Sequence, residues 1–180
     1  MVEELYIKKI LNGDTEAFRY FVTQYKDLAF SLAVSVVKDE FTAADVVQEA
    51  FVKAFEHLKS FKGKSKFSSW LMRIVINEAY KVVRRNKVNY TDELLELEEI
   101  SKDALKEADQ KFYVNEVLKI MAPNESLVLR LYYLNENNIL EICEMTGWAE
   151  SKVKVTLHRA RKSMEQKMKK LLSTEVESLI

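Results

Sequence analysis

The 180-residue sequence is poor in the residues that break or bend regular structure. It contains three glycines and one proline, which leaves little material for the tight turns of β-hairpins. No stretch alternates Val, Thr and aromatic residues as a half-buried strand does, whereas Ala, Leu, Glu and Lys are frequent. These absences predict an all-α protein.

Cysteine and histidine are also scarce. Cys143 is the single cysteine, and His57 and His158 lie too far apart in sequence for the spacing of a zinc site. The sequence shows no paired carboxylates, no Ser/His or Cys/His set and no glycine-rich phosphate loop. We therefore predict no catalytic residue, metal, cofactor or small-molecule substrate, and an enzyme is the least favoured class.

Long apolar runs are missing as well. None approaches the ~18 residues of a membrane span, and the N-terminal sequence "MVEELYIKKILNGD" carries acids where a signal peptide has a basic start. These features predict a cytoplasmic protein.

The charges that are present are segregated along the chain. The net charge is zero, with 28 basic and 28 acidic residues, yet residues 59–87 hold nine basic residues against one acid. Residues 92–116 hold nine acids against three lysines, and residues 151–172 hold eight basic residues against one acid. Two cationic surfaces separated by an anionic spacer indicate two contacts with one polyanion. The alternative is three solvated helix faces.

Hydrophobic periodicity divides the chain into two small helical domains. A four-helix body is predicted for residues 1–88, with its third helix opened by Thr42 and Asp45 as a capping box. An acidic linker is predicted at 89–110. Residues 111–180 form the second domain, in which Pro123 starts a helix and Thr146-Gly147-Trp148 joins a short helix to a long basic one. That pair has the form of a helix-turn-helix.

Two segments resemble the bacterial sigma factors of the extracytoplasmic-function type, in the sigma-seventy superfamily. The segment "ADVVQEAFVKAFEHLKSFKGKSKFSSWLMRIVINEAYKVVRR" is similar to the family's region two, and "EICEMTGWAESKVKVTLHRARKSM" is similar to region four. The match spans nearly the whole chain. Ala149, Glu150, Ser151, Val155 and Thr156 depart from the usual region-four pattern, which affects the expected base preference and leaves the expected fold unchanged.

The resemblance implies that the first basic segment holds the melted minus-ten element of a promoter. A flipped base is stabilised by a pocket and stacking surfaces beside a cationic track. The loop 62–68 and Asn77 would surround that base, and the basic residues of the following helix would contact phosphates. The residues implied are Lys62, Lys64, Ser65, Lys66, Phe67, Ser68, Arg73, Asn77, Lys81, Arg84 and Arg85.

The resemblance also implies two further surfaces. The second helix of the helix-turn-helix would read the minus-thirty-five element through Ser151, Lys152, Lys154, Val155, His158, Arg159, Arg161 and Lys162. The helix that follows Thr42 would dock on the clamp coiled coil of the largest subunit of core RNA polymerase through Asp45, Gln48, Glu49, Lys53 and Glu56.

The function that follows from the resemblance is an alternative sigma factor, which binds core RNA polymerase, recognises and melts promoter DNA and directs transcription initiation. An anti-sigma factor is the further partner that the family implies. Two non-enzymatic alternatives stay open. One is a one-component helix-turn-helix regulator that acts without polymerase, and the other is a helical interaction module with no role on DNA.

Overall fold

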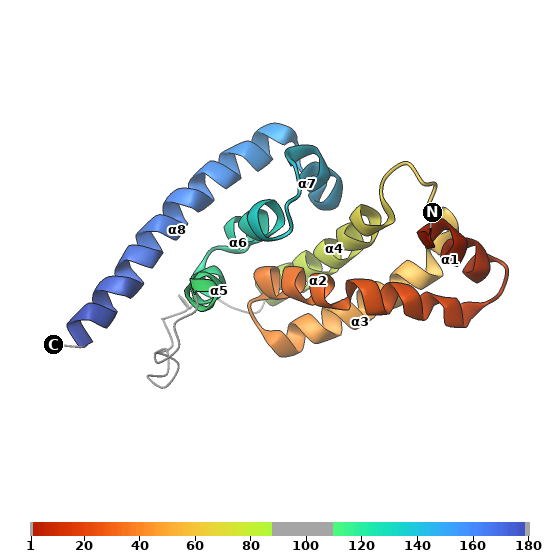
Figure 1. The fold of residues 1–180 in the computed structure, drawn as a ribbon, viewed down its shortest axis with the longest axis horizontal. Coiled ribbons are helices and arrows are strands. Elements are labelled where there is room, and N and C mark those ends of the chain that lie inside the picture. The colour runs from red at the N-terminus through yellow and green to blue at the C-terminus, as the bar shows by residue number, and fades with distance from the viewer. Residues whose placement is uncertain (1, 88–109, 179–180) are drawn as a thin grey trace.

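The computed structural model describes residues 2–87 and 110–178, and every described element is helical. The predicted acidic linker at 89–110 lies almost wholly outside the described residues. Figure 1 shows α1 to α4 in one half of the molecule and α5 to α8 in the other. The all-α prediction is confirmed within the part of the chain that the structure describes, and no helix there is both long and apolar enough to cross a membrane.

The first half contains α1 (Val2–Leu11), the 3₁₀ turn η1 (Thr15–Phe18), α2 (Arg19–Val37), α3 (Glu40–Glu56), η2 (Leu58–Ser60) and α4 (Phe67–Lys87). α2, α3 and α4 pack against one another pairwise. Phe21, Leu32, Leu71 and Met72 are fully buried between them. Because the apolar residues of each helix recur every three or four positions, each helix turns one stripe to this shared core.

Local sequence signals explain most helix boundaries. Gly13, with φ of 104°, follows α1, and Gly147, with φ of 70°, ends α7 in the left-handed conformation that glycine adopts without steric cost. The predicted capping box at Thr42 was wrong: α3 begins two residues earlier, at Glu40. Its cap is Asp39, whose carboxylate accepts a 2.7 Å hydrogen bond from the Thr42 amide.

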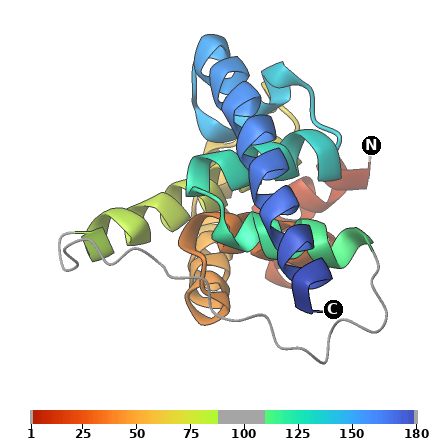
Figure 2. The same cartoon turned by 90° about the vertical axis from the view of Figure 1, so that its left-hand side faces the viewer.

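The second half contains α5 (Gln110–Ile120), α6 (Pro123–Leu129), a π-helical turn η4 (Arg130–Leu134), α7 (Ile139–Thr146) and α8 (Glu150–Ser178). Pro123 stands in the first turn of α6, as predicted. Asn138 and Glu141 form a capping box at the start of α7. Figure 2 shows α8 running across the outer side of this half, over α5 and α6.

The two halves share a hydrophobic core. Leu127, Leu131, Ile142, Met145 and Val153 of the second half belong to the same buried cluster as the core of the first half. α4 packs against α7, and α2 packs against α6. A smaller cluster, with Val117, Met121 and Leu157 among its buried members, lies inside the second half. The two predicted domains therefore pack against each other through apolar side chains in this structure.

A buried lysine also joins the halves. Lys38, in the left-handed conformation after α2, donates a 2.7 Å hydrogen bond through Nζ to the carbonyl oxygen of Leu118 in the last turn of α5. That carbonyl has no partner within its own helix, and a cation at a helix C-terminus is favourable. Burial, and to a smaller extent the charge of nearby Arg130, lowers the pKa of Lys38 to about 7.

This lysine predicts a pH dependence of stability. Because the native pKa is about 7 and the ordinary value is 10.5, the unfolded chain binds more protons between those values, and stability rises with pH in that window. The charged residues near Lys38 keep their charge over this pH range. Arg130 stays cationic, and Asp39 stays anionic because its hydrogen bonds to Thr42 lower its pKa. We expect the melting temperature of wild type, relative to Lys38→Met, to increase from pH 7 to pH 10. A difference in melting temperature between the two proteins that stays constant over this pH range would contradict the lowered pKa of Lys38.

Candidate nucleic-acid interface

The first candidate surface is the loop after η2 together with α4. Lys62 and Lys64 are exposed in the loop, where Gly63, with φ of 67°, makes the turn. Ser65 and Ser68 are half-buried. Phe67 is 2% exposed and packs on Phe21 with ring centroids 4.1 Å apart, so its side chain lies in the core beneath the loop. Its aromatic neighbours fix where the loop returns to α4.

Along α4, the sequence places polar residues at helical spacing on one side. Arg73, Asn77, Lys81, Arg84 and Arg85 are all exposed. Positions 73, 77, 81 and 85 succeed one another every four residues, so their side chains follow one face of the helix. The opposite face holds Leu71, Met72, Val75, Ile76 and Ala79, all buried. α4 therefore presents a cationic track with one amide in it, and the apolar face anchors that track to the core.

Trp70 lies beside this track without belonging to it. Its ring is half-buried and packs on Phe61 and Phe67, with centroids 5.3 and 5.5 Å away. Phe61, the residue before the basic loop, is thereby held at the edge of the aromatic core. The cluster provides a firm base for the loop 62–66.

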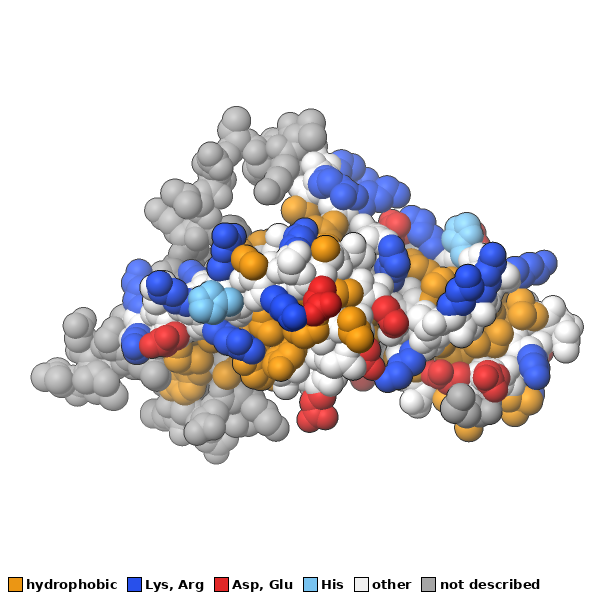
Figure 3. Space-filling view, turned by 90° about the horizontal axis from the view of Figure 1, so that it is seen from above, with side chains coloured by type: hydrophobic (Ala, Val, Ile, Leu, Met, Phe, Trp, Pro, Cys, Tyr) orange, Lys and Arg blue, Asp and Glu red, His pale blue; other side chains and the backbone are white. Residues whose placement is uncertain are grey.

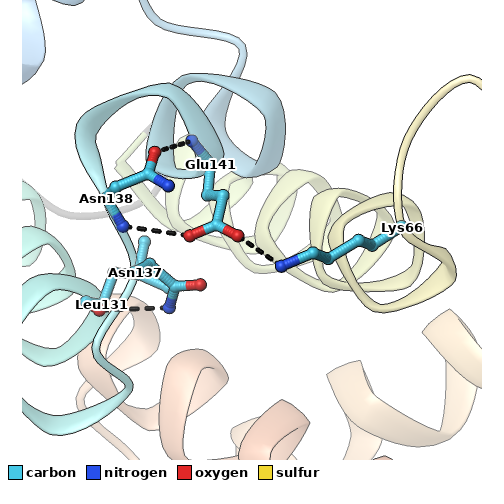
Figure 4. Close-up of polar contacts among 5 residues, drawn as sticks. All are labelled: Lys66, Leu131, Asn137, Asn138 and Glu141. Carbon is cyan, nitrogen blue, oxygen red and sulfur yellow. Dashed lines mark hydrogen bonds and ion pairs between the residues drawn. The ribbon is translucent and has the colours of Figure 1, made fainter.

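The start of the α4 surface contacts the second half of the molecule. Lys66 Nζ lies 2.6 Å from a carboxylate oxygen of Glu141 in α7, and Figure 4 shows the same carboxylate accepting from the Asn138 amide. Both contacts stabilise the anion, and they lower the pKa of Glu141. The Arg73 guanidinium lies beside Gly147 in the helix-turn-helix, where an added Cβ would come within 3.2 Å of Nη2.

The helix-turn-helix forms the second candidate surface. Val153, Leu157 and Ala160 of α8 are buried, whereas Ser151, Lys152, Lys154, Val155, His158, Arg159, Arg161 and Lys162 are exposed. Lys152 stacks over Trp148 at 4.1 Å, and Lys154 forms an ion pair with Glu150 at 2.5 Å. Figure 3 shows Lys and Arg side chains over both halves of the face viewed from above, with Asp and Glu side chains interspersed among them.

Arg161 points to a different neighbourhood from the rest of that set. Its Nε donates a 2.7 Å hydrogen bond to the Tyr133 hydroxyl, and its guanidinium lies over the rings of Tyr132 and Tyr133. It also lines an apolar groove of about 610 Å³ between α5, η4 and α8. Arg161 is therefore an exposed residue of α8 that also borders this groove.

The predicted docking residues of α3 are divided between two sides of the helix. Asp45, Glu49 and Lys53 line a polar pocket of about 470 Å³ shared with α4. Lys53 Nζ contacts Glu78 at 2.7 Å and Glu49 at 3.0 Å, and these bonds raise the pKa of Lys53. Glu56 is exposed at the end of α3.

Gln48 lies on the other side of α3 and lines an apolar groove of about 680 Å³ between α2 and α3. Its walls are formed mainly by Phe18, Val22, Phe30, Val47, Phe51, Val52 and Phe55. Val52 is 48% exposed and Phe55 is 37% exposed. Part of the apolar stripe of α3 therefore lies outside the core. The apolar stripe of α3 is wider than the face that one packed helix can cover. This width is the sequence signal that part of the stripe stays exposed.

Comparisons with known proteins match both halves of the chain to one family. The sigma-70 region 2 family model matches residues 21–88, and the sigma-70 region 4 model matches residues 111–164. The sequence is 30% identical to the ECF RNA polymerase sigma-E factor of Escherichia coli over 186 aligned residues, which cover 96% of this chain and 97% of that protein. It is 28% identical to the ECF RNA polymerase sigma factor SigW of Bacillus subtilis, over 92% of this chain and 96% of SigW.

Two solved structures share the fold. The first is CnrH in complex with the cytosolic domain of CnrY, with a TM-score of 0.67 and 21% identity over 92% of this chain and 96% of that chain. The other is the sigma factor RpoE in complex with the anti-sigma factor NepR from Bartonella quintana, with a TM-score of 0.62 and 21% identity over 85% of this chain and 96% of that chain.

Proposed function

The chain belongs to the extracytoplasmic-function group of RNA polymerase sigma factors in the sigma-70 family, and on this premise we propose how its surfaces divide the work of initiation. As an alternative sigma factor it directs transcription. A one-component regulator is not favoured, because a region 2 match and a region 4 match occur in the same chain. Sigma factors in general act by binding rather than by catalysis, and we extend that to this chain.

We assign the minus-ten element to residues 1–88 and the minus-thirty-five element to residues 111–180, with 89–110 as linker. The observation that carries this assignment is the exposed cationic track on α4, anchored by a buried apolar face within the region 2 match. Lys62, Lys64, Lys66, Arg73, Lys81, Arg84 and Arg85 would contact phosphates. Ser65, Ser68 and Asn77 would border the flipped base, and Phe67 would support them from the core.

The recognition helix would read base edges with Ser151, Lys152, Lys154, Val155, His158 and Arg159 in its first turns. Lys162, one turn further on, would contact a phosphate. Arg161 is left to the groove that it already lines. The promoter is the DNA partner that these two surfaces fit.

We propose that core RNA polymerase binds in the groove between α2 and α3. The polar residues at the rim of the groove and along α3 would belong to the same interface: Asp45, Gln48, Glu49, Lys53 and Glu56. A contiguous apolar surface of this kind on a folded protein is typical of an interaction site. Gln48 joins the groove to the polar residues, so one clamp helix lying in the groove can meet both. An anti-sigma factor is proposed as a further partner, as in the solved complex of RpoE with NepR. All these contacts would take place in the cytoplasm.

Asn77 gives the sharpest test of the minus-ten assignment. We expect Asn77→Ala to impair opening of duplex promoters by the holoenzyme, because the amide would no longer hold the unpaired base. The loss of one or two hydrogen bonds to a base corresponds to roughly 1–3 kcal/mol, or about 5- to 150-fold. The measurement is permanganate reactivity of promoter thymines.

The matched control is Gln24→Ala, which removes an exposed amide from α2 in the same half of the molecule. This variant should open promoters as wild type does. Normal opening by Asn77→Ala, with an unchanged base preference at the flipped position, would show that the pocket lies elsewhere.

A further inference from the structure

Val155 stands out on the recognition helix because its apolar side chain is exposed. It is 50% exposed, whereas Val153 and Leu157, two positions before and after it, are buried. Residues two positions apart on a helix point in nearly opposite directions. Ser151 and His158 are also exposed and lie four residues before and three residues after Val155, so the three share one face of α8. Val155 therefore lies in the middle of the face that points away from the core.

The position of Val155 along α8 is that of a base-reading residue. α8 begins at Glu150, so Val155 lies in the second turn of the helix. The N-terminal residues of a recognition helix are the ones that contact base edges in the major groove. On the minus-thirty-five assignment made above, the Val155 side chain therefore faces a base pair.

Two of the cations beside Val155 already interact with other side chains of the protein. Lys152 lies over the Trp148 ring at 4.1 Å, and Lys154 forms an ion pair with Glu150 at 2.5 Å. Both partners precede their lysines in the sequence, so both ammonium groups lean toward the start of α8. The second turn of the exposed face is thereby left to Val155.

The base edges of the major groove offer one apolar group. Guanine, adenine and cytosine present hydrogen-bond donors and acceptors there, and thymine alone adds a C5 methyl group. A valine pressed against a polar base edge would displace its water and give no hydrogen bond in return. Against the thymine methyl group, the same side chain buries apolar surface on both partners. An exposed valine on a base-reading face is therefore selective for thymine.

We propose that Val155 reads a thymine of the minus-thirty-five element through the C5 methyl group, and thereby sets the base preference of this chain at that position. The proposal rests on the minus-thirty-five assignment made above. Arg159 lies one helical turn further on, about 6 Å along the axis. Since successive base pairs are about 3.4 Å apart, the base that Arg159 reads should lie within about two base pairs of this thymine.

Replacing thymine by uracil tests the contact, because it removes the methyl group and nothing else. Each thymine in the minus-thirty-five element of a promoter that the holoenzyme transcribes is replaced in turn by deoxyuridine, on both strands, and holoenzyme binding is measured by competition. We expect one position at which uracil lowers the affinity of wild type about three- to tenfold, as the loss of one buried methyl contact predicts. With Val155→Ala, the same replacement should cost less than about twofold, because most of the surface that met the methyl group is gone.

Val2→Ala is the matched control, because it makes the same change at a 60% exposed valine of α1. It should keep the full penalty for uracil. Val155→Ser tests the same contact by selection from promoters randomised over the element. Wild-type holoenzyme should recover thymine at the position found with uracil, and the serine variant should lose that preference while the neighbouring positions stay unchanged.

Two results would overturn the proposal. One is an element in which no replacement of thymine by uracil weakens the binding of wild type, and the other is a uracil penalty that Val155→Ala retains in full. Arg159→Ala tests the minus-thirty-five assignment independently, since it should change base selection within the element. If it does so while uracil has no effect, only the thymine contact is wrong. If base selection also stays unchanged, the recognition helix is misassigned and the thymine contact is wrong with it.

Discussion

Val52→Asp is expected to abolish stable binding of the chain to core RNA polymerase. Val52 is 48% exposed on α3 and lines the apolar groove between α2 and α3. The free protein tolerates an aspartate there because water reaches the side chain. A clamp helix seated in the groove would bury that carboxylate without a partner, at a cost of several kcal/mol. The expected loss of affinity is therefore on the order of 100-fold or more, measured by co-purification and by titration with core enzyme.

Val2→Asp supplies the control, because it makes the same change at an exposed valine of α1 that is not part of the groove. It should bind core enzyme as wild type does. Asp45→Arg with Glu49→Arg tests the polar side of α3 separately. If only that double variant loses binding while Val52→Asp retains it, the docking surface faces α4 and the groove serves another purpose.

Arg84→Ala with Arg85→Ala should weaken promoter binding by the holoenzyme on every sequence, by roughly tenfold or more at physiological salt. Both side chains are exposed in the last turns of α4. Phosphate contacts carry no sequence information, so the relative preference among promoters should stay constant. The slope of log affinity against log salt should fall by roughly 0.7 to 0.9 for each phosphate that is no longer neutralised. Filter binding across a salt series measures both effects.

Lys8→Ala with Lys9→Ala is the matched control, because it removes two consecutive exposed cations from α1. This control tests whether net charge alone explains the change. If it reduces affinity and slope as much as the arginine pair does, the effect comes from the overall field of the protein. A change in base preference for the arginine variant would instead place those side chains at base edges.

Much of the fold follows from local sequence signals. Pro123, the Asn138 to Glu141 capping box and Gly147 mark helix ends because each supplies a backbone conformation or a hydrogen bond that a helix terminus requires. The error at Thr42 has the same origin. Asp39 and Thr42 can both cap a helix, and in the structure the Asp39 carboxylate accepts a hydrogen bond from the Thr42 amide, so the helix takes the earlier start.

The candidate site was less predictable, because its details depend on contacts between residues far apart in sequence. Periodicity places Phe67 on α4, but its burial depends on Phe21, 46 positions earlier. Arg161 looks like its basic neighbours on α8 until Tyr133 is seen to accept its hydrogen bond. Likewise, Lys66 meets Glu141 only because two halves separated by 89–110 pack together, and no local pattern encodes that arrangement.

The most direct measurement of sigma-factor function is run-off transcription with core RNA polymerase across genomic fragments, with and without the purified chain. We predict discrete transcripts that require the chain, start downstream of a common pair of promoter elements and disappear with Val52→Asp. Transcription that does not change when the chain is added, together with sequence-specific DNA binding in the absence of polymerase, would contradict this function.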